Sequence, residues 1–186
     1  ILAIHHSLGA FRHEEVFSEG RGIEVELQSC TVLVGYAPQF GSTPESARRR
    51  LDWNALILNR IVRLRGLNRP FLYGGDLNIT ESPADCHKGF KYTPSWRKSG
   101  VDAMAAVCHV SPDDLQGWPS CTAFERREHE QLLREGSLIR LSGSGFTWRD
   151  PYRRGCCLDY LYGRGFATIS SWVGDCMGSD HRTLSV

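Results

Sequence analysis

Segment 73–82, YGGDLNITES, carries a carboxylate at Asp76 and a carboxamide at Asn78, immediately after two glycines. The preceding residues, RPFLY, are a short apolar run after a proline, which predicts a buried strand leading into the glycines. Because side chains alternate along an extended strand, Asp76 and Asn78 should point to the same side at its end. Strand ends are where α/β sheets gather their chemistry. Gly, Asp and Asn are also common in turns, and taken alone the segment favours a simple turn.

Two later segments add polar groups of the same kind. LDY places Asp159 within a predicted strand, and GSDH places Asp180 beside His181 at the start of a final apolar strand. With Asp76 and Asn78 they form a set suited to holding a divalent metal and attacking a phosphodiester. Each has an ordinary explanation: Asp180 as a turn cap, Asp159 as an arginine partner, His181 as a partly buried histidine. Those explanations account poorly for their joint occurrence, which favours chemistry.

The first elements that must position these groups are predicted in the N-terminal third. Residues 1–7, ILAIHHS, are typical of a strand. Residues 23–38 are rich in Val and Ile and are broken by the turn-like QS, which predicts a hairpin-like pair. A helix is predicted over 43–64, with Thr43 as N-cap, Pro44 at the first helical position and apolar residues at helical spacing behind them.

The second half is predicted to contain one more helix and several short strands. A long irregular stretch is expected over 80–120, and the helix then spans 122–136, capped by Thr122 and stopped by Gly136. Late strands are predicted at 145–150, 157–163 and 167–173. Strands with a long helix between them, followed by late strands, predict a layered α/β sandwich. No repeat or low-complexity linker divides the chain, so residues 1–186 are expected to form a single domain.

The composition fits a globular domain, and the net charge is too small to attract nucleic acid by itself. The chain has 186 residues, of which 41% are hydrophobic and 23% charged, enough to bury a core. No apolar run is long enough for a transmembrane helix, and the start at Ile1 lacks a signal-peptide pattern, so no membrane partner is expected. With a net charge of +1, nucleic-acid binding would rest on local arginine clusters, each of which is more often simply a solvated face. These clusters lie at 47–50, 60–69, 125–127 and 152–155.

The cysteines and histidines give no metal motif by spacing. The seven scattered cysteines are Cys30, Cys86, Cys108, Cys121, Cys156, Cys157 and Cys176. They contain no C-x-x-C pair, and no H-E-x-x-H occurs, so the spacing predicts no zinc site. Reduced thiols are expected, as in an intracellular protein of the nucleus, the cytoplasm or an organelle.

The motifs GDLNI, LDY and GSDH, in that order, resemble the signatures of the endonuclease/exonuclease/phosphatase superfamily, which has the fold of DNase I. SEGRGIEVEL followed by VLVGYAP is similar to the hairpin of exonuclease III and the apurinic/apyrimidinic endonucleases. CTAFERREHEQLL is similar to a helix of that same branch, and the resemblance covers nearly the whole chain. It implies an α/β fold, a DNase I-like two-sheet sandwich flanked by helices.

The resemblance implies a role for each matched polar residue. Asp76 would position or deprotonate the attacking water, and Asn78 would hold the phosphate. His181, oriented by Asp159, would contact the scissile phosphate and stabilise the charge that builds on its oxygens. The implied reaction is a metal-dependent hydrolysis of a phosphodiester with in-line displacement.

A metal ion and a nucleic-acid partner are also implied. Asp180 would be a ligand of Mg²⁺ or Mn²⁺. Tyr36, in GYAP, would hydrogen-bond the phosphate, although a tyrosine there is otherwise an ordinary packing residue. DNA is the expected partner and RNA the alternative. From the place of Arg153 and Arg154 before LDY, and from the 47–50 cluster, we expect these two residues and Arg48 to contact phosphates.

The chain also departs from the family pattern. The family's first two strands, which carry an asparagine and the main metal-binding glutamate, should lie before ILAIHH, so the resemblance implies a fold that is incomplete at its N-terminus. A second chain is one candidate to cover the missing strands. Cys156 stands where the family has an aromatic residue in front of LDY, which leaves abasic specificity open. Residues 86–119 do not match the family closely.

Two classes of function follow. The first is a metal-dependent DNA nuclease of the abasic-endonuclease or exonuclease III type, poorly active as this chain. The second is a catalytically silent domain that serves as a structural or RNA-contacting subunit of a larger assembly such as an organellar ribonucleoprotein. The joint presence of the polar residues favours the first class, because a scaffold needs none of them. The expected loss of two strands favours the second, because it exposes a sheet edge that a partner would cover.

Overall fold

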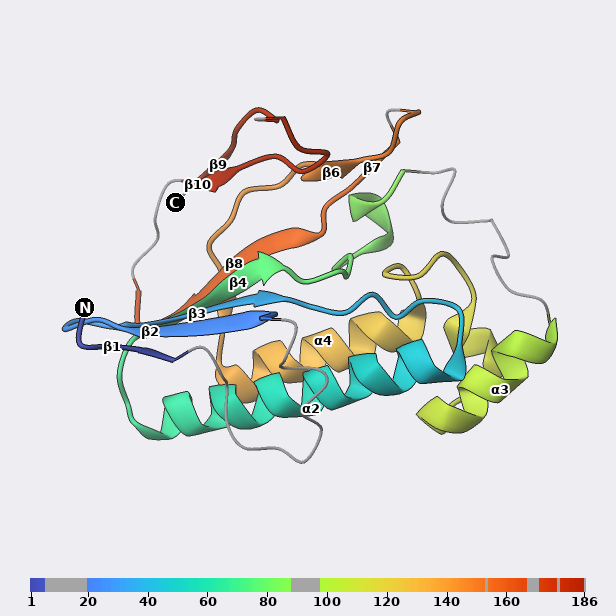
Figure 1. Cartoon of the computed structure of the whole chain (residues 1–186), viewed down its shortest axis with the longest axis horizontal. Coiled ribbons are helices and arrows are strands. Elements are labelled where there is room, and N and C mark those ends of the chain that lie inside the picture. The colour runs from blue at the N-terminus through green and yellow to red at the C-terminus, as the bar shows by residue number, and fades with distance from the viewer. Residues whose placement is uncertain (6–19, 88–97, 153, 167–170, 177, 186) are drawn as a thin grey trace.

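A six-stranded mixed sheet forms the centre of the molecule, in a computed structural model that describes residues 1–5, 20–87, 98–152, 154–166, 171–176 and 178–185. The strand order is β1-β2-β3-β4-β8-β5 (Figure 1). The strands are β1 (Ala3–His5), β2 (Gly22–Glu26), β3 (Thr31–Tyr36), β4 (Phe71–Asp76), β8 (Asp159–Arg164) and β5 (Ile139–Arg140). Strands β3 and β4 are parallel, and each other neighbouring pair is antiparallel. The predicted hairpin is confirmed, and so is the first strand over Ala3–His5. Residues 6 and 7, which were predicted to belong to that strand, lie outside the described residues.

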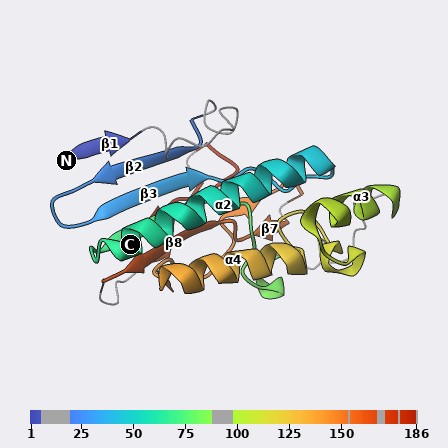
Figure 2. The same cartoon turned by 90° about the horizontal axis from the view of Figure 1, so that it is seen from below.

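Two long helices pack side by side against one face of this sheet (Figures 1 and 2). Helix α2 (Pro44–Gly66) is the crossover between the parallel strands β3 and β4, and α4 (Ala123–Gly136) precedes β5. Thr43 and Thr122 cap them as predicted, each in a reciprocal capping box with the residue three positions on. The core between helices and sheet contains Leu33, Trp53, Ile57, Ile61, Phe71, Leu132, Tyr160 and Tyr162. No helix in the described part of the chain is both long and apolar enough to cross a membrane.

The opposite face of the sheet is covered over β4 and β8 by two short strand pairs (Figure 1). One pair joins β6 (Trp148–Arg149) to β7 (Gly155–Cys156), and the other joins β9 (Trp172–Val173) to β10 (Leu184–Ser185). Of the strand predicted over 167–173, residues 167–170 lie outside the described residues. The layered α/β sandwich is therefore confirmed, and its second sheet consists, among the described residues, of two small pieces.

The prediction of an irregular stretch over 80–120 was wrong for part of its length. The described residues there include two 3₁₀ turns, η1 (Pro83–Asp85) and η3 (Pro112–Leu115), and a helix between them, α3 (Lys98–Cys108). Met104 and Ala105 of α3 pack with Ala47 of α2 in a second core cluster. The helix was missed because its apolar residues are mostly small and form an unbroken run at 103–108, so they show no clear helical spacing until α2 supplies a surface to pack on.

The glycine pair before Asp76 is explained by how closely the central strands approach. Gly75 has a positive φ of 122° and lies opposite Gly35 of β3. A Cβ at Gly75 would run into the Gly35 carbonyl oxygen, so a side chain is excluded on conformational and steric grounds. The pair thus allows β4 to reach its end with Asp76 in register with both neighbours.

Candidate active site

Strand register brings three of the predicted side chains into one row at the end of the sheet. Tyr36 on β3 is the register partner of Asp76 on β4, and Asp76 is in turn the partner of Asp159 on β8. His181 comes from the other layer, where it forms an isolated bridge with Trp148 of β6. A pocket of about 260 Å³ opens at this point. Its lining consists of Tyr36, Gln39, Asp76, Asn78, Trp118, Pro119, Ser120, Trp148, Cys156, Leu158, Asp180 and His181.

His181 lies between two carboxylates. Its Nδ1 donates to Asp159 Oδ2 at 2.8 Å, and its Nε2 is 3.9 Å from Asp76 Oδ2. The hydrogen bond to Asp159 raises the pKa of His181, and the nearby carboxylates add to this against the effect of partial burial. Asp159 is itself held by Thr147, whose hydroxyl accepts its backbone N–H at 3.0 Å. The imidazole is therefore oriented and biased toward its cationic form, which suits contact with a phosphate.

Asp76 is a partly buried carboxylate whose pKa is raised toward neutral pH. Burial raises its pKa to about 6, with a further contribution from the charge of Asp159. The backbone N–H of Asn78, which donates to Asp76 Oδ1 at 3.0 Å, acts in the opposite direction. A carboxylate with a pKa of about 6 is charged at pH 7 and still basic enough to accept a proton from water.

Asn78 reaches the site by a turn rather than by strand alternation. Strand β4 ends at Asp76, and Asn78 has a left-handed φ of 46°. Its amide donates to the Ala37 carbonyl at 2.9 Å and to Asp76 Oδ2 at 3.4 Å. The two side chains were expected to meet because both lie on an extended strand, and that reason was wrong. The side chains of Asp76 and Asn78 do meet, but through a turn that begins where β4 ends.

Asp180 is exposed at the rim of the pocket. Its Oδ2 accepts from the indole N–H of Trp148 at 2.9 Å, and Oδ1 accepts from the Ser179 hydroxyl at 3.4 Å. The indole bond lowers the pKa of Asp180, so this carboxylate is charged. Among the described residues, no three-donor cluster of close His, Cys, Asp or Glu ligand atoms includes Asp76, Asp159 or Asp180. The donors suit Mg²⁺ in kind, since it is commonly held by one or two carboxylates with waters and substrate phosphate.

Of the arginines predicted to contact nucleic acid, Arg48 and Arg154 do not line this pocket. Arg153 lies outside the described residues. Arg154 donates through Nε to Asp150 at 2.7 Å and lies over the ring of Tyr152. Arg48 lines a separate hollow between α2 and α3, together with Leu51 and Val107.

Arg50 is a residue whose role the sequence did not reveal. Although it belongs to the 47–50 cluster that was expected to face phosphates, its side chain is buried. Its Nη1 donates to the carbonyls of Pro38 and Asn78, at 2.9 and 3.3 Å, so it joins the two loops that follow β3 and β4, just beyond Tyr36 and Asp76. Ala47 and Arg50 are three positions apart and so lie on the same, core-facing side of α2. This spacing was the available sequence signal that Arg50 is buried.

Ser120 was also missed. It lines the pocket, it has a positive φ of 75°, and its buried hydroxyl has no hydrogen-bond partner among the described residues. A buried hydroxyl without a partner is costly, so this atom is suited to a ligand oxygen. No motif marks it, because its position depends on the loop before α4.

A mixed α/β sandwich with carboxylates, an amide and an imidazole at one sheet end defines a class of DNase I-like proteins. The profile of the Endonuclease/Exonuclease/phosphatase family matches residues 8–181, and the chain belongs to this family. The similarity falls in its exonuclease III and AP endonuclease branch, as the sequence resemblance predicted. Enzymes of the family are generally dependent on a divalent metal.

Individual relatives agree with this placement. The chain is 28% identical over 122 residues to a DNA-(apurinic or apyrimidinic site) endonuclease of Plasmodium falciparum, covering 65% of this chain and 18% of the relative. The structure of the 3′ phosphatase NExo from Neisseria, bound to product DNA hairpin, matches with a TM-score of 0.71 and 16% identity over 98% of this chain and 69% of that one. AP endonuclease LMAP from Leishmania major matches with a TM-score of 0.68 and 15% identity, over 98% of this chain and 59% of that one. The match thus spans about a fifth of the curated relative's length, and the structural likeness supports the DNase I-like fold.

Proposed function

We propose that this chain contributes the phosphate-handling half of a DNA phosphodiesterase that resembles the abasic-site endonucleases and exonuclease III. The observation that carries the proposal is the contact chain from Asp159 to His181 and on toward Asp76, at the mouth of a pocket where Tyr36 and Asn78 also lie. A structural scaffold would not require a partly buried carboxylate beside an oriented imidazole.

In the proposed reaction, Asp76 positions a water molecule and accepts its proton as the water attacks phosphorus. His181, held by Asp159, donates a hydrogen bond to a non-bridging phosphate oxygen and offsets its growing negative charge. Asn78 and Tyr36 hold the phosphate in line with the attacking water. Asp180 would hold the divalent cation, which when bound neutralises the phosphate and the leaving oxygen.

The substrate class is taken from the relatives and from the chemistry of the pocket walls. Relatives of this chain are named as AP endonucleases, and one structural neighbour holds a product DNA hairpin. Two indole side chains, Trp118 and Trp148, line the pocket and give it apolar walls against which a sugar or base can pack. Cys156 is also part of the wall, at the position where the family has an aromatic residue, so specificity for abasic sites is open. We therefore propose DNA 3′ ends and abasic sites as the substrates to compare first.

A non-catalytic role within an assembly is the second candidate, and an exposed apolar surface favours it. Ile4, Ile23 and Val34, on adjacent strands β1 to β3, are each about half exposed, at 48%, 40% and 46%. Neighbouring apolar side chains on an open sheet face are typical of a surface that packs against further protein. Under this candidate the pocket would bind a phosphodiester, in DNA or RNA, without cleaving it.

Cleavage assays on three substrates separate the two candidates. The protein is this chain extended at its N-terminus by the first two strands of the family, incubated with Mg²⁺ and an abasic duplex, a nicked duplex or an RNA hairpin. The nuclease proposal predicts that Asp76→Asn lowers kcat by about 10²- to 10⁴-fold, the range for loss of acid–base catalysis. His181→Asn should lower kcat by about 10²- to 10³-fold, the range for loss of one donor to the charge that builds in the transition state. Asp102→Asn, on the exposed side of α3, serves as control and should leave kcat unchanged. Binding of the substrates without cleavage of any of them would favour the assembly role.

A further inference from the structure

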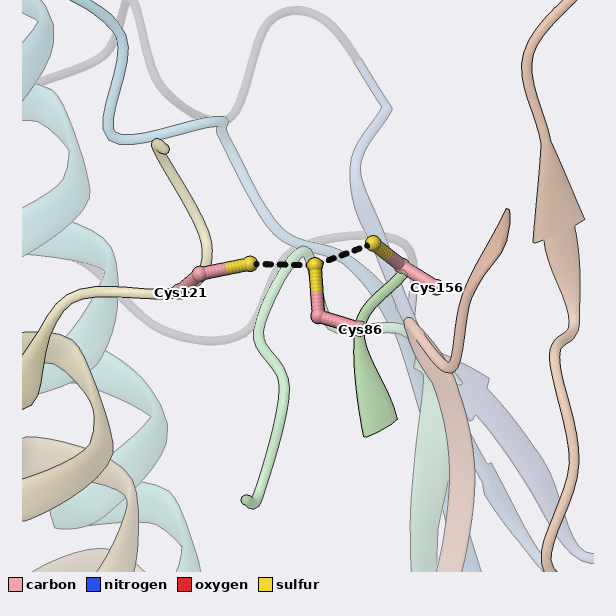
Figure 3. A group of neighbouring side chains, drawn as sticks. All are labelled: Cys86, Cys121 and Cys156. Atoms are coloured by element: carbon pink, nitrogen blue, oxygen red, sulfur yellow. Dashed lines mark hydrogen bonds between the residues drawn. The ribbon is translucent and has the colours of Figure 1, made fainter. Parts of the chain in front are cut away.

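Three cysteines that are far apart in the sequence meet beside the pocket (Figure 3). Cys86 follows η1, Cys121 precedes the cap of α4, and Cys156 is the last residue of β7. The Sγ atom of Cys86 is 2.9 Å from Cys156 Sγ and 3.1 Å from Cys121 Sγ. The seven cysteines, all within the described residues, form no disulfide. Sequence spacing gave no indication of this cluster, because each thiol comes from a different segment.

The backbone around each thiol is fixed independently of the sulfur atoms. Cys86 and Cys156 are partners in an isolated antiparallel bridge, and the neighbouring His87 N–H donates to the Gly155 carbonyl at 2.8 Å. The N–H of Cys121 donates to the Trp118 carbonyl at 2.8 Å. The three thiols are therefore brought together by the fold, which lowers the ordering cost of binding a shared ligand.

The surroundings of the three thiols are largely apolar, with one cation close by. Leu158, Trp118 and Trp148 pack around the cluster and screen it from solvent. Arg126 donates through Nη1 to the Cys121 carbonyl, which places a positive charge next to this segment of the cluster.

We propose that Cys86, Cys121 and Cys156 form a binding site for a thiolate-preferring metal ion, with Zn²⁺ as its occupant. Zinc is bound by cysteine thiolates at about 2.3 Å, so tetrahedral ligands lie about 3.8 Å apart. The sulfur atoms at 2.9 and 3.1 Å would need to separate by less than about 1 Å to reach that spacing. Binding displaces the thiol protons to solvent, and three protein ligands leave one coordination position for a water molecule.

The open position would face the candidate active site, since Cys156 lines that pocket. A bound ion would also clamp three segments together: the loop after η1, the turn before α4 and strand β7. A disulfide between Cys86 and Cys156 would use only two of the three thiols and leave Cys121 against the bond. The convergence of three donors therefore favours a metal ion over a disulfide.

Cobalt substitution tests the site on the 186-residue chain, purified with a thiol-free reductant. Co²⁺ alone is titrated into the chain, and thiolate-to-cobalt charge transfer with tetrahedral d–d bands is expected to saturate at one equivalent. Zn²⁺ should displace the cobalt and bleach the spectrum. Serine at Cys86, Cys121 or Cys156 should weaken binding by at least about 100-fold, because even outer-sphere partners of a ligand change affinity about 10- to 100-fold.

Cys108→Ser is the matched control, since Cys108 is buried on α3 and outside the cluster, and it should bind as the original chain does. Circular dichroism of each variant shows whether the fold is kept. The cobalt spectrum of the unsubstituted chain decides the proposal even where a variant fails to fold. A folded, reduced chain that gives no thiolate–cobalt band, or a band that persists in the folded Cys86→Ser variant, would overturn it.

Discussion

At the residue scale, His181 depends on a carboxylate behind it. Asp159 accepts from Nδ1, so the other ring nitrogen, Nε2, is directed toward Asp76 and the pocket. This arrangement could be anticipated in part, because strand-end acids and a histidine recur in GDLN, LDY and GSDH. Arg50 and Ser120 could not be found in the same way, because their roles depend on loops that meet only in the folded chain.

Asp159→Asn in the extended protein tests this orientation. The amide keeps the shape of the side chain but cannot stabilise a cationic imidazole, so we expect kcat to fall by about 10²-fold or more, with little change in KM. The pH profile should shift as well, because Asp159 is the main cause of the raised pKa of His181. An unchanged kcat and pH profile would show that Asp159 has no positioning role.

His129 is a buried neutral histidine that links α4 to the sheet. The Tyr162 hydroxyl donates to Glu81 Oε1 at 2.6 Å, so His129 Nε2–H must donate to the tyrosine oxygen, at 2.8 Å. Burial lowers the pKa of His129 to about 3, and the charges of Arg50 and Arg140 act in the same direction. The folded state therefore keeps this imidazole neutral where the unfolded chain binds a proton.

This histidine predicts a loss of stability in acid. Because the folded pKa is depressed, the contribution is fully present above about pH 6.5 and is lost as pH falls toward 3, at up to about 1.4 kcal/mol per pH unit. Glu125 acts in the opposite sense, because burial raises its pKa to about 7, so its contribution is present below about pH 4.5 and is lost as pH rises through 7. The difference in urea unfolding free energy between the original chain and His129→Gln isolates the histidine. Between pH 6.5 and 4.5, the slope of that difference against pH should approach about 1.4 kcal/mol per pH unit, the value for uptake of one proton on unfolding. A pH-independent difference would contradict the assignment.

At the element scale, the capping residues were the most reliable sequence signals. Thr43 and Thr122 begin α2 and α4 where predicted, because a cap is a local interaction between a side chain and a nearby backbone N–H. Helix α3 and strand β7 were not predicted, whereas β6, β9 and β10 fall within predicted strands whose partners the sequence did not specify. Their residues are stabilised by contacts distant in sequence, such as the pairing of Trp148 with Cys156.

The two caps differ in burial, and this predicts different costs of removal. Thr122 is fully buried and its hydroxyl donates to Glu125 at 2.8 Å, whereas Thr43 is exposed. Thr122→Ala should cost about 2 kcal/mol, at the upper end for a cap, and Thr43→Ala about 1 kcal/mol or less. For a chain of this length that corresponds to about 2 to 4 °C of melting temperature per kcal/mol. Equal losses in thermal melts of the two variants would show that burial of the cap is unimportant.

At the scale of the whole molecule, the sheet has one covered and one partly open face. Leu33 faces the helices in the core, so its neighbour Val34 points to the other face, where it pairs with Ile23. The layered class could be predicted from the order of elements. The division of the second layer into two small pairs depends on pairing between distant segments, which the order of elements does not specify.

Nucleic-acid binding is expected to depend on salt. Arg153 and Arg154 precede β7, and their joint replacement by alanine should weaken binding of duplex DNA and reduce the slope of log K against log salt by about 1 to 2, since each phosphate contact contributes about 0.9. Arg154 pairs with Asp150, and loss of this ion pair on binding would offset part of the contribution of Arg154. Fluorescence anisotropy at several salt concentrations measures both quantities. If affinity and slope both stay the same, these arginines do not contact phosphate.

The central claim, that this chain holds the groups that act on the phosphate, is tested most directly by cleavage of an end-labelled abasic duplex with Mg²⁺. Three proteins are compared: the 186-residue chain, the chain extended by the family's first two strands, and the extended chain with Asp76→Asn. Among the described residues that line the pocket, Asp180 is the carboxylate assigned to the cation. A single carboxylate holds the cation weakly, so we expect the chain alone to cleave barely above background. The extended chain should cleave the duplex, and Asp76→Asn should abolish that activity. An extended and folded chain that does not cleave, or one that cleaves equally well with Asp76→Asn, would contradict the account.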